Sequence, residues 1–181
     1  MAGRTQRPPA PRKLRVFTVG TEFSYGVYSN LVFGLESSDP TIAYINGFHA
    51  TINQIVKETG RRVGMMVVIH PDAKPPTEAV RRHILTIARE FAPKVIAFAH
   101  VVEGQGFLAA AKRAAMTFIM TTARFGFPLK VFSNVHEATR WLLATLGPEF
   151  KEDIRADELC GLIEELRRTQ FAKVPETERR L

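Results

Sequence analysis

The segment from Lys94 to Gly147 constrains the fold of this chain more than any other part of the sequence. It predicts, in order, a strand, a glycine turn, a long helix, a second strand and a second helix. These are Val95–Val102, Glu103–Gly106, Gly106–Arg124, Leu129–Phe132 and Val135–Leu146. The first strand is almost continuously apolar, which is typical of a strand covered on both faces. Strands that alternate with helices in this way favour a largely parallel sheet with helices on its faces.

The rest of the chain extends the same pattern at both ends. Leu14–Val19 and Val27–Leu35 read as two strands of a hairpin, with the turn at Ser24-Tyr25-Gly26. Further elements are predicted at Pro40–Glu58 (helix, N-cap Asp39), Val63–Ile69 (strand), Glu78–Phe91 (helix) and Ile154–Gln170 (helix). We therefore expect an α/β fold: a mostly parallel sheet of four to five strands, covering helices, one antiparallel edge strand and an extra C-terminal helix. The expected parts are a disordered basic tail (1–13), the α/β domain (14–147), and a C-terminal amphipathic helix with a polar tail (148–181).

Composition restricts the class of protein. Hydrophobic residues make up 45% and charged residues 24% of the 181, which is ordinary for a globular protein. No apolar run reaches the roughly 18–20 residues of a membrane span, and no secretory signal is recognisable. Cys160 is the single cysteine, so no intrachain disulfide can form, and we expect a cytoplasmic location.

The net charge of +7 is concentrated at the N-terminus. The basic residues there, with no acid among them, are Arg4, Arg7, Arg12, Lys13 and Arg15. One interpretation is a solvated tail. The other is an electrostatic arm for nucleic acid, an anionic membrane or an acidic protein partner.

Polar residues follow the predicted parallel strands, where α/β proteins bind ligands. They are His70, Asp72, Glu103 and His136, and the glycines Gly104 and Gly106 beside Glu103 belong to the same candidate ligand site. Imidazole and carboxylate groups suit acid–base chemistry or a metal, but no pair has a diagnostic spacing, so we predict neither a metal nor a cofactor. Both phosphate-binding patterns, GxGxxG and GxxxxGK[ST], are absent, and a tight turn explains the two glycines. Thr77 is expected to cap the next helix.

Two helices offer surfaces for binding. In Gly106–Arg124 we expect one face to be buried, formed by Leu108, Ala111, Ala115, Phe118, Ile119 and Thr122. The face expected to be exposed, and available for interaction, carries Arg113, Thr117, Met120 and Arg124. The apolar stripe of the last helix includes Leu159, Ile163 and Leu166. That helix either caps its own domain or pairs with another chain, and periodicity does not decide between the two.

The order of elements resembles the STAS-like fold of anti-sigma-factor antagonists. The strings HVVEGQGFLAAAKRA and FPLKVFSNVHEATRWL also resemble uncharacterised bacterial proteins of this STAS-like or CRAL-TRIO-like group. The resemblance covers residues 14–147 and implies a small regulatory or binding domain that acts through protein partners. Phosphorylatable STAS domains carry an Asp-Ser motif after the central strand. Here the matching stretch, HPDAKPPTEA, has no serine, and Thr77 is the only candidate phospho-acceptor.

The leading hypothesis is therefore a non-enzymatic regulatory or scaffolding domain that binds protein, with a homodimer as one form. The first alternative is an enzyme or small-ligand binder at the strand-end crevice around His70, Asp72, Glu103 and His136. The second is association with nucleic acid or an anionic membrane through the basic tail.

Overall fold

The structure of the chain is a computed structural model that describes residues 14–19, 22–123, 125–150 and 154–172. The strands are β1 (Arg15–Val19), β2 (Phe23–Tyr28), β3 (Leu31–Glu36), β4 (Val63–Ile69), β5 (Val95–Val102) and β6 (Leu129–Phe132). The α-helices are α1 (Ile42–Thr59), α2 (Glu78–Phe91), α3 (Gly106–Ala123), α4 (Val135–Leu146) and α5 (Ala156–Ala172). The tail predicted at 1–13 lies outside the described residues.

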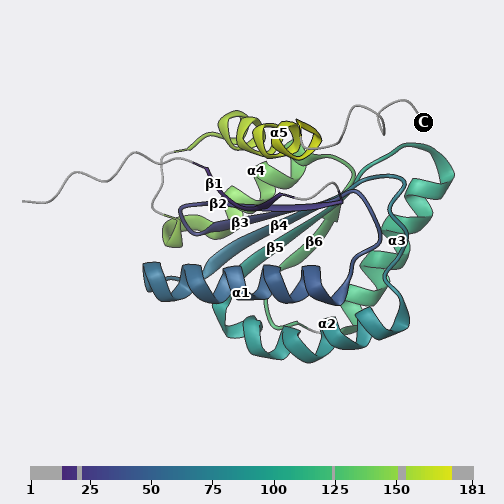
Figure 1. Ribbon diagram of the computed structural model, residues 1–181, viewed down its shortest axis with the longest axis horizontal. Coiled ribbons are helices and arrows are strands. Elements are labelled where there is room, and N and C mark those ends of the chain that lie inside the picture. The colour runs from purple at the N-terminus through teal and green to yellow at the C-terminus, as the bar shows by residue number, and fades with distance from the viewer. Residues whose placement is uncertain (1–13, 20–21, 124, 151–153, 173–181) are drawn as a thin grey trace, which may run out of the picture.

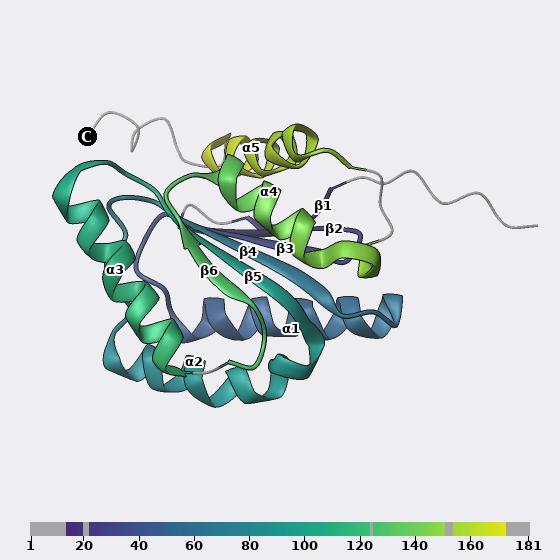
Figure 2. The same cartoon turned by 180° about the vertical axis from the view of Figure 1, so that it is seen from behind.

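All six strands form one sheet in the order of the sequence, β1 to β6. The pairings among β1, β2 and β3 are antiparallel, and those from β3 to β6 are parallel. Each parallel crossover moves the same way along the sheet, so right-handed connections carry α1, α2 and α3 to one face. Figures 1 and 2 show these helices on one side of the sheet and α4 and α5 on the other. The predicted α/β class is confirmed, with six strands where four to five were expected.

The extra strand arises because the predicted first turn is wrong. Ser24-Tyr25-Gly26 lies inside β2 and pairs with β3. The chain turns instead at Ser29-Asn30, where Ser29 has a φ of 55° and the Asn30 side chain donates to the carbonyl of Arg62 at 2.7 Å. Ser and Asn favour turns because their short side chains bond to nearby backbone. The run Val27–Leu35 is therefore split between two strands.

Of the two N-caps expected from the sequence, one is found. The hydroxyl of Thr77 caps α2 by accepting from the backbone N–H of Val80. At its C-terminal end, α1 stops at Gly60, which has a φ of 65°. Asp39, however, does not cap α1. Thr41 does so, while Asp39 accepts from the backbone N–H of Lys74 at 2.9 Å. Asp39 thus ties the start of α1 to the loop that follows β4.

Two apolar layers enclose the sheet. One layer joins α4 and α5 to the sheet and includes Phe33, Met66 and Val101 of the strands with Leu142 and Ile163 of the helices. The other joins α1 and α2 to the sheet and includes Val32 and Met65 of the strands with Ile52, Ile87 and Phe91 of the helices. Because neighbouring residues of a strand point to opposite faces, both faces of the central strands are buried. This explains why β4 and β5 are apolar almost throughout.

Candidate functional site

Two of the four polar residues predicted at the strand ends are paired with α5. Glu103 accepts from the guanidinium of Arg167 at 2.8 Å, and both side chains are about three-quarters buried. Nε2 of His136 lies 3.7 Å from a carboxylate oxygen of Asp157. Both residues therefore face the helix that follows the predicted domain rather than a shared crevice.

The other two, His70 and Asp72, contact each other in the loop after β4. The backbone N–H of Asp72 donates to Nδ1 of His70 at 3.3 Å, and the Asp72 side chain is 88% exposed. In the described part of the chain, no group of three or more His, Cys, Asp or Glu side chains could hold a metal ion. Of the four residues, His70 and Asp72 thus contact each other, whereas Glu103 and His136 each contact a residue of α5.

The glycines after β5 form a tight turn, as interpreted from the sequence. Gly104 and Gly106 have φ values of 104° and 81°, which residues with a Cβ atom rarely adopt. A Cβ atom at Gly104 would also lie 3.2 Å from Cβ of Pro71. Thr77 is confirmed as a helix cap, and its role as a phospho-acceptor stays a prediction.

The orientation of α3 is opposite to the one expected, and this is the main correction to the predicted surfaces. Leu108, Phe118 and Ile119, expected inside, are 68%, 73% and 41% exposed, and Phe107 beside them is 90% exposed. The side chain of Ala109 is buried instead, and Met120 is half-buried. Ala111 and Ala115, expected inside, are also exposed, whereas Thr117 is exposed as expected. Arg124 and the side chain of Thr122 lie outside the described residues.

Two cations hold α3 in this orientation. Nζ of Lys112 donates to the carbonyls of Pro71 and Ala73 at 2.5 and 3.2 Å. Arg113 donates to the carbonyls of Val102 and Gly104 at 3.1 and 3.2 Å. Charged hydrogen bonds of this kind contribute about 1.5–3 kcal/mol each. The side of α3 that carries Lys112 and Arg113 thus faces the carbonyls that follow β4 and β5, and the apolar side faces solvent.

The last helix packs on its own chain. Leu159, Ile163 and Leu166 are fully buried, and α5 contacts α4, β1 and β2. Of the two alternatives left open by the sequence, the structure shows the one in which α5 caps its own domain. In the basic segment, Arg15 pairs with Glu58 at 2.8 Å. Arg4, Arg7, Arg12 and Lys13 lie outside the described residues, so their binding role stays a prediction.

Two buried ionisable residues were not singled out from the sequence. Glu36 ends β3 with only 7% of its surface exposed, and burial raises the pKa of its carboxyl to about 7. His100 lies within β5, stacked on Phe98, and burial lowers its pKa to about 4. Neither ring nitrogen of His100 has a hydrogen-bond partner among the described residues. The one signal in the sequence that could have indicated them is the presence of a titratable residue in an apolar strand, Glu36 in β3 and His100 in β5.

Comparisons with known proteins concern the fold. No family model and no curated protein matches the chain. The chain is similar to a solved structure of an uncharacterized protein from Shewanella loihica PV-4, of the DUF3478 family, described as having a SpoIIAA-like fold. The TM-score is 0.47 and the identity 11%, over 67% of this chain and 94% of that one. No helix within the described ranges is long and apolar enough to span a membrane.

Proposed function

We propose that this chain is a non-enzymatic regulatory or scaffolding domain that works by protein–protein interaction, and that α3 is its binding surface. The observation that carries the proposal is the exposed apolar side of α3, with Phe107, Leu108, Phe118 and Ile119 at 41–90% exposure. Large exposed apolar side chains gathered on one element mark interaction sites more often than single ones do. The cytoplasmic location expected from the single cysteine is part of this proposal.

The lack of charge on this surface favours a protein partner. Lys112 and Arg113 are the only charged residues of α3, and both donate to backbone carbonyls of the same chain. Helices that lie on anionic membranes usually carry exposed Lys and Arg beside the apolar face, and nucleic acid requires cations too. The exposed side of α3 therefore has no cation for an anionic membrane or a nucleic acid.

The pattern along α3 favours a second copy of this chain as the occupant. Large side chains lie near both ends of the exposed side and alanines between them: Phe107, Leu108, Ala111, Ala115, Phe118 and Ile119. These positions are symmetric about residue 113. In an antiparallel pair related by a twofold axis, residue 107 would face 119, 108 would face 118, and the alanines would allow a close central crossing. The surface is therefore self-complementary.

A dimer built on one helix pair is small. At 1.5 Å per residue, α3 is about 27 Å long, so the interface falls below the roughly 1,600 Å² of standard complexes. We expect a dimer that dissociates on dilution, which sedimentation velocity across a concentration series would detect. A protein that stays monomeric at every concentration and binds anionic vesicles instead would contradict the proposed partner.

The double variant Leu108→Asp, Ile119→Asp tests this surface directly. Each changed residue occurs twice in a symmetric dimer, so we expect the dimer to weaken by at least about 100-fold. Sedimentation measures the constant, and circular dichroism checks that the fold is retained. Leu85→Asp is the matched control, because Leu85 is 45% exposed on α2 and lies outside the proposed interface. An equal loss in both variants would argue against α3.

A further inference from the structure

We propose that the outer edge of β6, together with the cavity beside it, binds an extended segment of another protein as a seventh strand. The segment would present an acidic residue flanked by two large apolar ones. This site is separate from the exposed apolar side of α3, and it would give a dimeric scaffold a second binding surface.

The outer edge of β6 offers backbone groups to a further strand. β6 ends the sheet, pairs in parallel with β5 alone, and has no further described strand on its outer side (Figure 2). The backbone N–H of Phe98 donates to the carbonyl of Pro128 at 2.9 Å. Because the direction of backbone groups alternates along a strand, Lys130 also faces β5, whereas the N–H and C=O groups of Leu129 and Val131 point outward. An edge of this kind is a template for an additional strand.

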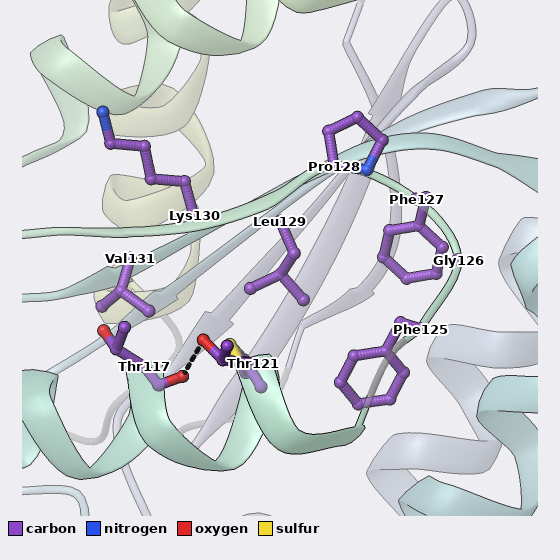
Figure 3. Close-up of a pocket in the computed structure, with 10 residues that line it drawn as sticks. Thr117, Thr121, Phe125, Gly126, Phe127, Pro128, Leu129, Lys130 and Val131 are labelled. Atoms are coloured by element: carbon purple, nitrogen blue, oxygen red, sulfur yellow. Dashed lines mark hydrogen bonds between the residues drawn. The ribbon is translucent and has the colours of Figure 1, made fainter.

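A cavity of about 600 Å³ lies between β6 and the C-terminal half of α3. Its lining residues are Thr117, Met120, Thr121, Phe125, Gly126, Phe127, Pro128, Leu129, Lys130 and Val131. Figure 3 shows the side chains of Leu129 and Val131 directed toward α3, and the rings of Phe125 and Phe127 at one end. The hydroxyls of Thr117 and Thr121 donate to carbonyls of their own helix at 2.8 Å. The space therefore suits apolar side chains.

Lys130 is the one charged residue among those that line the cavity. Lys130 points away from the cavity in Figure 3, and its ammonium lies 5.3 Å from the centre of the Phe132 ring, on the opposite face of the sheet. Side chains of an added strand alternate between the two faces. Residues on the α3 side would enter the cavity, and the residue between them would approach Lys130. An acidic residue there forms a cross-strand ion pair.

The same lysine argues against β6 of a second copy as the occupant. An antiparallel pair of two β6 strands centred on Lys130 would place the two ammonium groups opposite each other, which destabilises the pairing. The partner is therefore another protein with an acidic residue at this position.

Blocked pentapeptides serve as probes for the full-length chain. Thr-Phe-Glu-Phe-Thr is expected to bind roughly tenfold more tightly than Thr-Phe-Lys-Phe-Thr, because the central residue changes from an attractive to a repulsive neighbour of Lys130. Titration followed by NMR would show the largest shifts at the amides of Leu129 and Val131. Lys130→Glu should reverse the preference, whereas Lys74→Glu, at another exposed lysine, should leave it unchanged.

A backbone variant separates strand pairing from binding elsewhere. Val131→Pro removes an N–H that points outward, so it is expected to keep the pairing with β5 and to lower peptide affinity at least tenfold. No binding of either peptide, equal binding of both, or a preference that Lys130→Glu does not change would each overturn the proposal. None of these results bears on dimer formation through α3, which sedimentation measures separately.

Discussion

Replacing Glu36 by Gln is expected to stabilise the protein at pH 8 by up to about 3 kcal/mol. Burial raises the pKa of this carboxyl from 4.5 to about 7, so the folded state holds its proton more tightly than the unfolded state. The stability contributed by the neutral form is complete below pH 4.5 and is lost as the pH rises through 7. Glutamine keeps the shape and stays neutral at every pH, so the variant avoids this loss.

His100 has the opposite dependence. Burial lowers its pKa from 6.5 to about 4, so the unfolded state binds the proton more tightly. The stability contributed by the neutral imidazole is complete above pH 6.5 and is lost as the pH falls toward 4. Between pH 4.5 and 6.5 the two contributions have similar size and opposite sign. We therefore expect these two groups to leave little net pH dependence in that interval.

In each single variant, the pH dependence of stability that the other residue contributes is no longer compensated and should become measurable. Glu36→Gln is expected to lose stability on acidification from pH 6.5 to 4, and His100→Phe to lose stability as the pH rises from 4.5 to 7. Urea unfolding at unit pH steps measures both slopes, with Glu22→Gln as a control at an exposed acid. If Glu36→Gln ran parallel to the wild type across the whole range, the buried carboxyl would not be the source.

The parallel half of the fold could be predicted from the sequence because local patterns determine it. The bounds of β4, α2, β5, β6 and α4 are those expected, since apolar runs and helix caps are local signals. The antiparallel strands β1 to β3 are harder to predict from the sequence. Ser24-Tyr25-Gly26 has turn-type residues but lies in a strand, where Gly26 lets the chain approach Leu14 and Arg15 closely. Turn residues alone do not distinguish such a strand from a real turn.

The surfaces could not be predicted, because tertiary contacts decide them. A periodic helix such as α3 normally buries its apolar side. Here Lys112 donates to a carbonyl of the loop after β4, and Arg113 donates to the carbonyl at the end of β5. Likewise Glu103 and His136 both lie after predicted strands, yet each finds its partner on α5, which no local pattern indicates.

Removing α5 should cost more than any single substitution discussed above. Ending the chain at Gly147 exposes the surface that Leu159, Ile163 and Leu166 cover, and at roughly 2 kcal/mol per aliphatic side chain this amounts to about 6 kcal/mol. That value is comparable to the 5–15 kcal/mol by which a typical domain is stable. The shortened chain is therefore expected to lose cooperative unfolding and to bind a hydrophobic dye.

Point variants show whether that loss reflects packing on the chain itself. Ile163→Ala leaves a cavity under α5 and should lower the free energy of unfolding by about 3 kcal/mol. Glu165→Ala, at an exposed position on the outer side of the same helix, should change it by less than about 0.5 kcal/mol. Urea unfolding of the three proteins gives the values. If α5 were instead a segment that pairs with another chain, the protein ending at Gly147 would unfold with an unchanged midpoint and slope, and Ile163→Ala would be neutral in the monomer. Full burial of Ile163 against the sheet leads us to expect the opposite result.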